Sequence, residues 1–328
     1  MAREKKTAGK NGPARTAQER KEADAMKQYG ALEAGGTKMV LAVISEEGTI
    51  LERTSIPTRT PEETMPEMIA FFENRKTAAL GIGCFGPLDL NPLSPAFGSI
   101  TATPKLAWRG YPILKAFQEK LRIPAALDTD VNGAALAESV LGAARGLESC
   151  LYVTVGTGIG GGVIINGRPV HGLMHPEIGH IPVRPVPGDP MPEGICPYHG
   201  CCLEGMASGP SMEKRWGISA RALPPDHPAW ELEAAYLAQL CCTAMLSFSP
   251  EKIILGGGVM QQKSLFPMIR EKTAALLRGY IAVPAVESGL AGYITEPGLG
   301  IDSGILGAYL LARQAEEQDR VQTLKNQA

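Results

Sequence analysis

The sequence of 328 residues lacks any run of the roughly 18 apolar residues that a membrane-spanning helix needs. Its N-terminus is charged and polar, without the apolar core of a secretory signal. We therefore expect neither a membrane-embedded nor a secreted protein.

Cysteine is present in a pattern that argues against disulfides. The chain has seven cysteines, an odd number, and four of them form two adjacent pairs, Cys201–Cys202 and Cys241–Cys242. Together with the missing secretory signal, this pattern predicts free thiols in a reducing compartment and hence a cytoplasmic location.

Charge of either sign is not in surplus. Lys and Arg number 32 against 34 Asp and Glu, the net charge is -2 and the pI is about 6.3. These totals give no reason to expect nucleic acid or an anionic membrane as a partner. With 44% apolar and 20% charged residues, the chain has the composition of a globular protein of one large domain or two medium lobes.

Residues 1–26 differ from the rest of the chain. They carry seven Lys/Arg against four Asp/Glu and almost nothing that could enter a core, which predicts a disordered tail. A nucleic-acid-binding arm is the alternative interpretation.

The order of predicted elements occurs twice. Strand, glycine turn and strand around residues 31–44 are followed by a third strand, helices and a strand at 79–84. A second strand and glycine turn begin at Leu151, after a predicted helix from Asn132 to about Leu141. The proline-rich segment 167–210 interrupts this second set as an irregular insert. We therefore predict an α/β protein with two lobes of similar plan.

Three glycine clusters each follow a predicted strand: Gly35-Gly36-Thr37-Lys38, Gly156 to Gly162, and Gly256-Gly257-Gly258. Glycine lets backbone N–H groups approach an anion closely, although each cluster alone is also compatible with an ordinary turn. Gly156, Gly158 and Gly161 fit G-x-G-x-x-G, but a β-rich run follows them where a dinucleotide-binding fold requires a helix. The Walker pattern is also missing. Glycine hairpin turns from two lobes are typical of the actin-like ATPase fold.

Asp130 lies between a short apolar strand and a helix, where α/β folds place side chains at the mouth of a cleft. It is a candidate for the helix cap or for a general base that accepts a proton from a hydroxyl group.

A Cys/His cluster lies in the proline-rich insert. His180, Cys196, His199, Cys201 and Cys202 fall within 23 residues. Tetrahedral zinc takes such nitrogen and sulfur ligands, and four protein ligands indicate a structural metal. Free cysteines and surface histidines are the alternative.

These motifs together resemble the ROK family of sugar kinases and repressors, from about Gly30 to about Ala312. The matching segments are Leu32 to Lys38, Asp130-Val131-Asn132, Gly156 to Gly162, Glu177-Ile178-Gly179-His180, Cys196 to Gly205, and Leu255 to Val259. Three further segments resemble the bacterial fructokinase branch of that family. They are Cys196-Pro197-Tyr198-His199, Gly83 to Leu90, and Thr103-Pro104-Lys105 with Trp108.

The resemblance implies a two-lobed actin-like ATPase (ribonuclease H-like) fold with a cleft between the lobes and a small zinc-bearing insert. It implies a small lobe of residues 27–131 plus about 302–316, and a large lobe of residues 132–301 with the insert at about 175–206. It also implies ATP, Mg²⁺ and structural Zn²⁺ as cofactors and a homodimer.

The resemblance assigns roles residue by residue. Asp130 is the implied base. Sugar contacts are implied for Gly86, Pro87, Thr103, Lys105, Asn132, Glu177, His180 and Glu204. ATP contacts are implied for Gly35, Gly36, Thr37, Lys38, Gly156, Thr157, Gly158, Gly160, Gly257 and Gly258. The implied zinc ligands are His180, Cys196, His199 and Cys202, with Cys201 as the alternative to Cys202.

The implied reaction is ATP-dependent phosphorylation of fructose at its C6 hydroxyl. A kinase for mannose, glucose or an N-acetylated hexosamine is the first alternative. A sugar-responsive repressor is disfavoured, because only about 30 residues precede the first strand and they lack the apolar periodicity of packed helices. A sugar-binding protein without turnover is disfavoured by Asp130 and the three glycine clusters.

Overall fold

The computed structural model describes residues 27–327. The predicted disordered tail, residues 1–26, lies outside the described residues. Among residues 27–327, no helix has both the length and the apolar character to cross a membrane.

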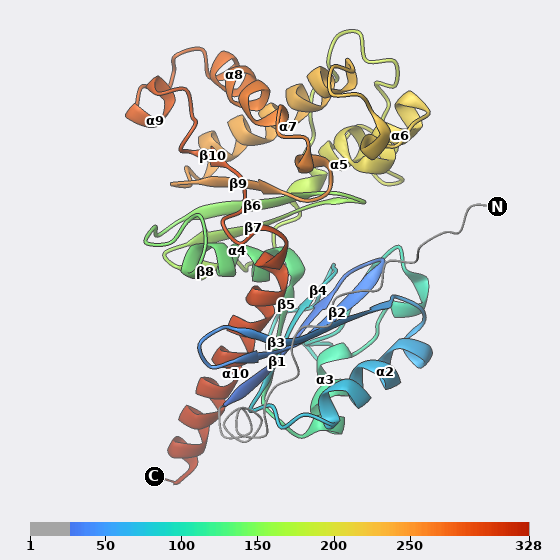
Figure 1. Ribbon diagram of the computed structural model, residues 1–328, viewed down its shortest axis with the longest axis vertical. Helices are drawn as coiled ribbons and strands as arrows, with labels where there is room; N and C mark the ends of the chain where they lie inside the picture. The colour runs from blue at the N-terminus through green and yellow to red at the C-terminus, as the bar shows by residue number, and fades with distance from the viewer. Residues whose placement is uncertain (1–26, 328) are drawn as a thin grey trace, which may run out of the picture.

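Two five-stranded sheets form the framework, one above the other in Figure 1. The first sheet has the order β3-β2-β1-β4-β5, and the second has the order β10-β9-β6-β7-β8. In the first, β1 pairs antiparallel with β2 and parallel with β4, and in the second β6 pairs in the same way with β7 and β9. The predicted repetition of element order is confirmed. The strands are β1 (Gln28–Ala34), β2 (Lys38–Ser45), β3 (Ile50–Pro57), β4 (Leu80–Cys84), β5 (Ala125–Thr129), β6 (Cys150–Val155), β7 (Ile159–Ile165), β8 (Arg168–Pro169), β9 (Ile253–Gly256) and β10 (Ile294–Thr295).

Helices cover the outer faces of both sheets and fill the space between them (Figure 1). On the first sheet lie α2 (Pro61–Glu73) and α3 (Ile113–Leu121), and on the second lie α7 (Ala229–Ser247) and α8 (Leu265–Leu277). The shorter helices α5 (Leu203–Ala207), α6 (Gly209–Trp216) and α9 (Pro284–Glu287) belong to the same half as α7. Short 3-10 turns are η1 (Leu106–Trp108), η2 (Ile178–His180), η3 (Ala220–Ala222), η4 (Val259–Gln261) and η5 (Gly300–Asp302).

Two helices join the halves. Helix α4 (Asp130–Val140) packs on β6 and β7, α10 (Ser303–Gln327) packs on β1, β4 and β5, and the two helices pack on each other. A Cβ on Gly307 would lie only 2.1 Å from the Gly133 carbonyl oxygen, so the helices cross with their backbones in contact. Only glycine allows this close approach.

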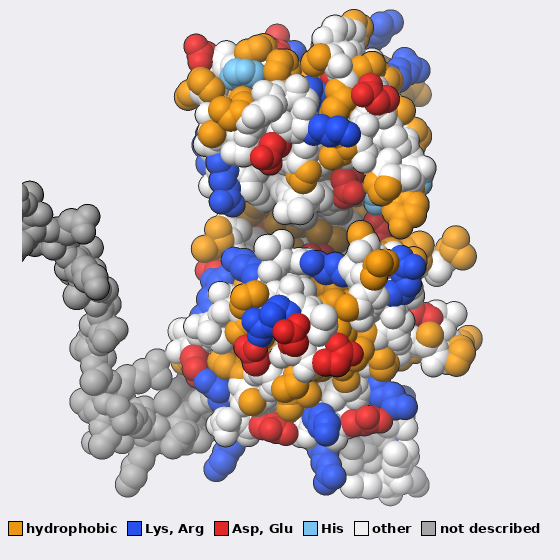
Figure 2. Space-filling view, turned by 90° about the vertical axis from the view of Figure 1, so that its right-hand side faces the viewer, with side chains coloured by type: hydrophobic (Ala, Val, Ile, Leu, Met, Phe, Trp, Pro, Cys, Tyr) orange, Lys and Arg blue, Asp and Glu red, His pale blue; other side chains and the backbone are white. Residues whose placement is uncertain are grey.

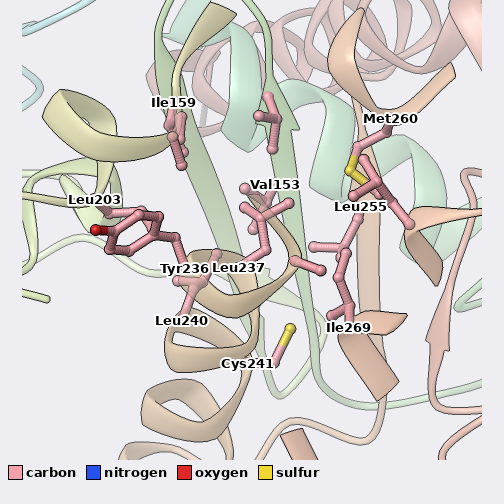
Figure 3. Packing of buried hydrophobic residues seen from close by; sticks show 14 of the residues in the cluster. Val153, Ile159, Leu203, Tyr236, Leu237, Leu240, Cys241, Leu255, Met260 and Ile269 are labelled. Atoms are coloured by element: carbon pink, nitrogen blue, oxygen red, sulfur yellow. The ribbon is translucent and has the colours of Figure 1, made fainter. Parts of the chain in front are cut away.

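The core of the second half is built from strand and helix faces that the apolar runs of the sequence predict. Figure 3 shows Val153 of β6 and Leu255 of β9 facing Leu237, Leu240 and Cys241 of α7. All five are fully buried. Burying one such aliphatic side chain stabilises the fold by about 1.5–3 kcal/mol, so this layer fixes the position of β6 and β9, which lead into the glycine turns.

Glu138 is a fully buried carboxylate that ties α4 to the start of α10. It accepts hydrogen bonds from three backbone N–H groups, those of Ala143 at 2.7 Å, Gly298 at 2.9 Å and Leu299 at 3.0 Å, and from the Ser303 hydroxyl at 2.7 Å. Four donors satisfy the carboxylate without a cation.

We expect Glu138→Ala to lower the free energy of unfolding by about 3–5 kcal/mol, because it leaves these buried donors unpaired. Chemical denaturation would measure the loss. Glu119→Ala, which removes an exposed carboxylate paired with Lys115 on α3, is the control and should change the value by less than about 1 kcal/mol. Equal losses in the two variants would contradict the role of Glu138.

Candidate active site

Two cavities meet at the N-terminus of α4. The first, of about 610 Å³, is lined by Gly256, Gly257 and Gly258 and is called the Gly256 cavity here. The second, of about 600 Å³, is lined by Glu177, His180 and Glu204 and is called the Glu204 cavity. Asp130 and Val131 line both. Figure 2 shows the molecule hollowed between its upper and lower halves, the level at which these cavities lie.

Asp130 is not the cap of α4. The Thr129 hydroxyl accepts the hydrogen bond from the Asn132 N–H at 3.0 Å and so caps the helix. Asp130 is the first helical residue, where its carboxylate accepts from the Val131 N–H at 2.9 Å. The capping interpretation of Asp130 is therefore wrong, and its carboxylate is left to face the two cavities.

The surroundings of Asp130 bring its pKa near neutrality. Burial raises the pKa of this carboxyl, and the negative charge of Glu33 adds to the effect, so that the pKa reaches about 7. Burial also raises the pKa of Glu33, with Arg53 and Lys38 opposing the rise. A carboxyl that exchanges its proton near pH 7 has the property that a general base or acid needs.

The Gly256 cavity contains some of the predicted ATP contacts. Gly257, Gly258 and Lys38 line it. Glu33 also lines it and was not among the residues that the sequence predicted. The sequence feature that could have identified Glu33 is a single carboxylate near the end of the mostly buried strand β1, two residues before Gly35.

The first glycine turn lies between β1 and β2. The Gly35 N–H donates to the Lys38 carbonyl at 3.0 Å, which closes the turn around Gly36 and Thr37. The Lys105 side chain lies beside it, with its Cε 3.3 Å from the position of a Cβ on Gly36. Lys105, predicted to contact the sugar, thus lies at the glycine turn.

The Glu204 cavity brings together most of the predicted sugar contacts. Gly86, Pro87, Glu177, His180 and Glu204 all line it. Burial and the nearby Glu204 raise the pKa of Glu177 to about 7.

Besides Lys105, two predicted sugar contacts do not line either cavity. Thr103 is buried between Ala102 and Pro104, which do line the Glu204 cavity. Asn132 is also buried, and its Nδ2 donates to Asp128 Oδ1 at 2.8 Å. The other Asp128 oxygen lies 3.0 Å from Nε2 of His171. In this arrangement Asn132 supports the strand end behind Asp130.

The second glycine turn is shorter than predicted. It comprises Gly156, Thr157 and Gly158, because β7 already begins at Ile159. The Gly156 N–H donates to the Gly158 carbonyl at 2.9 Å. Gly160, predicted to contact ATP, belongs to the strand and lines the Glu204 cavity.

The Cys/His cluster forms from four of the five residues that the sequence offered. Ligand atoms of His180, Cys196, His199 and Cys202 all lie within 4.8 Å of one another. Nδ1 of His180 is 3.5 Å from Sγ of Cys202 and 3.8 Å from Sγ of Cys196, and Nδ1 of His199 is 3.7 Å from Sγ of Cys196. A tetrahedral zinc with Zn–S near 2.3 Å and Zn–N near 2.05 Å separates nitrogen and sulfur ligands by about 3.6 Å. The donor set and spacing therefore fit zinc, and Cys201 lies outside the group.

Comparison with known proteins decides the family. The ROK family profile matches residues 29–315. The chain belongs to the ROK family. Among its relatives, the fructokinase of Pediococcus pentosaceus is 46% identical over 286 residues, which cover 87% of this chain and 98% of the relative. The fructokinase of Zymomonas mobilis is 44% identical over 301 residues, covering 89% of this chain and 98% of the relative.

Solved ROK structures share the fold. The ROK hexokinase of Thermus thermophilus has a TM-score of 0.72 and 28% identity, and the match covers 89% of this chain and 99% of that protein. The ROK glucokinase of Streptomyces griseus, solved with glucose and AMPPNP, has a TM-score of 0.70 and 25% identity over 88% of this chain and 99% of that protein. The predicted actin-like ATPase fold of this ROK protein is thereby confirmed.

Proposed function

We propose that this ROK protein is a fructokinase that transfers the γ-phosphoryl group of ATP to the C6 hydroxyl of fructose. The observation that carries the proposal is the position of Asp130 at the junction of a glycine-lined cavity and a cavity lined by Glu177, His180 and Glu204. The fructokinases of Pediococcus and Zymomonas, alike over nearly their whole lengths, support fructose as the sugar.

The chemistry follows from this arrangement. Fructose occupies the Glu204 cavity, and ATP occupies the Gly256 cavity with its phosphates toward Asp130. Asp130 takes the proton of the C6 hydroxyl as its oxygen bonds to the γ-phosphorus, and the bond to the bridging oxygen breaks to release ADP. Catalysis is then mainly positioning and electrostatic stabilisation.

The proposal assigns Mg²⁺ and zinc to different residues. Glu33, a carboxylate on the Gly256 cavity, would help to hold Mg²⁺, which when bound neutralises phosphate charge. Zinc would be held by His180, Cys196, His199 and Cys202, a closed set of four ligands that suits a structural ion.

The proposal includes the division into a small lobe (27–131 and about 302–316) and a large lobe (132–301), which close on the substrates and exclude water. A homodimer and a cytoplasmic location belong to it as well. The unpaired cysteines among the described residues suit a reducing compartment.

Sugar preference is tested by ADP release from the purified protein with Mg-ATP and one of five sugars: fructose, mannose, glucose, N-acetylglucosamine or N-acetylmannosamine. We expect kcat/KM for fructose to exceed that for each other sugar by about tenfold or more, which corresponds to about 1.4 kcal/mol of transition-state discrimination. Faster turnover of another hexose would move the specificity to that sugar. If folded, zinc-loaded protein turned over none of these sugars, the proposal that it is a kinase would be overturned.

A further inference from the structure

We propose that Glu204 is a positioning residue through which the Cys/His cluster holds the second glycine turn in place. The inference rests on the proposed function in one respect, that this turn serves the phosphates of ATP. It gives Glu204 a task beyond the predicted contact with the sugar.

The first observation is a hydrogen bond from the turn to Glu204. The N–H of Ile159, the residue directly after Gly158, donates to Oε2 of Glu204 at 2.8 Å. A Cβ on Gly158 would lie 2.7 Å from the same oxygen, so the carboxylate sits against the backbone of the turn. A contact with the sugar alone would not require this arrangement.

A second contact holds the other end of the turn. The Gly209 N–H, at the start of α6, donates to the Gly156 carbonyl at 2.8 Å. Helices α5 and α6 are consecutive, and Glu204 lies in the first of them. The segment that follows the last cluster ligand therefore contacts the turn at both Gly156 and Ile159.

The cluster in turn fixes Glu204. Cys202 is the N-cap of α5, so Glu204 follows a cluster ligand by two residues. His180 has Nδ1 at the cluster, 3.5 Å from Sγ of Cys202, and Nε2 toward Glu204, 3.9 Å from Oε1. A metal-bound histidine whose other ring nitrogen faces a carboxylate is the usual way in which a metal site orients its surroundings.

The 3-10 turn that carries His180 also touches the start of β7. A Cβ on Gly179 would lie 1.8 Å from the Ile159 carbonyl oxygen, so backbone packs on backbone there. Ile159 is thus held through its N–H by Glu204 and through its carbonyl side by the residue before a cluster ligand. These two contacts link the position of Ile159, and with it the second glycine turn, to the Cys/His cluster.

Hydrogen–deuterium exchange of the backbone amides of residues 156–162 tests this role in full-length, zinc-loaded protein without sugar or nucleotide. We expect Glu204→Ala to speed exchange of the Ile159 amide by about tenfold or more, since it removes a hydrogen bond to a charged acceptor. Metal content, measured by atomic emission, should stay at the wild-type level. Chelation of zinc from the wild type should speed exchange in the same residues.

Two matched variants separate this role from a contact with the sugar. Glu204→Gln keeps an oxygen that can accept from Ile159, so exchange should stay within about threefold of the wild type. Glu177→Ala removes another carboxylate of the same cavity, one that lies 3.5 Å from Nδ1 of His175, and should weaken sugar use without changing exchange at 156–162. Glu204→Ala should raise KM for ATP as well as for fructose, and Glu177→Ala should raise KM for fructose alone.

Unchanged exchange of the Ile159 amide in zinc-loaded Glu204→Ala would overturn the positioning role and leave the kinase standing. Faster exchange in Glu177→Ala, equal to that in Glu204→Ala, would also overturn it, because the effect would then come from loosening of the whole cavity. Failure of the wild type to phosphorylate any sugar would remove the proposed function without affecting the exchange result.

Discussion

Asp130→Asn is expected to lower kcat for fructose phosphorylation by about 10³-fold, the order of effect that a positioned general base contributes. Asparagine has nearly the same shape but cannot accept the proton from the hydroxyl. Fructose affinity, measured by titration calorimetry, should change little, because the interaction that is lost belongs to the transition state.

Asp128→Asn is the matched control for Asp130. Asp128 lies two residues earlier and is buried against Asn132 and His171, and it does not line either cavity. We expect Asp128→Asn to keep more than a tenth of the wild-type kcat. A tenth of wild-type turnover in Asp130→Asn itself would rule out Asp130 as the base.

The pH dependence of the reaction gives the same hypothesis a second readout. Because the base works only when deprotonated, kcat/KM should rise with pH and level off above about 7, the pKa of Asp130 in the substrate-free protein. Glu177 has a pKa of about 7 as well and would titrate over the same range. Glu177→Gln should therefore keep the rise with pH, since Asp130 remains.

Stability should move in the opposite direction to activity in Asp130→Asn. The pKa of Asp130 is about 7 in the folded protein, whereas that of a water-exposed aspartate in the unfolded chain is 3.8. The contribution of this group to stability is thus fully present below about pH 4 and lost as pH rises through about 7. Asparagine has no such loss, so at pH 8 the variant should unfold at a higher temperature than the wild type.

Cys202→Ser is expected to abolish metal binding, the second large effect. Bound zinc should fall from about one ion per chain to near zero, because a structural site needs all four ligands. Loss of the ion removes the link that holds α5 and the 3-10 turn of His180 together, so Tm should fall by about 10 °C. Metal analysis and calorimetry of freshly purified protein would measure both.

Cys201→Ser is the control that the chain itself provides. Cys201 is the neighbouring residue and has the same chemistry, but its sulfur lies outside the cluster. The variant should keep its zinc and its Tm. The reverse result, with metal lost from Cys201→Ser and retained by Cys202→Ser, would show that the assignment of the ligand is wrong.

Local elements of the fold follow closely from the sequence. The apolar runs around residues 39–44 and 151–155 predict strands that the structure places at Lys38–Ser45 and Cys150–Val155. Pro61 with Glu62 and Glu63 predicts the start of a helix, and α2 does begin at Pro61. These features depend on neighbouring residues alone, and so the sequence contains them in full.

The structural role of each glycine in the second cluster could not be predicted from the sequence. Gly156 to Gly162 suggested one long turn, but from Ile159 onward the chain pairs with β6. Gly162 is glycine because a Cβ there would lie 2.2 Å from the Val131 carbonyl oxygen of α4. A glycine that makes room for a helix from elsewhere in the chain looks the same in the sequence as one that forms a turn.

The sequence indicated some side chains of the candidate site and missed others. The sequence indicated Asp130, Glu177, His180 and Glu204 through their motifs, and all four line the Glu204 cavity. It did not indicate Glu33, whose charge reaches Asp130 only after β1 and β5 have joined the same sheet. It implied sugar contacts for Asn132 and Thr103, both of which are buried and do not line the cavity.

The sequence by itself thus determined the two sets of strands, the position of the glycine turns, the family and the residue types of the Cys/His cluster. Only the tertiary structure decided that Cys202 rather than Cys201 joins the cluster and that Glu204 contacts the second glycine turn. The physical reason is distance. Membership of the cluster, pKa and the contact of Glu204 depend on groups that approach to within a few ångströms of each other, and residues far apart in the chain meet there only when the sheets and helices pack.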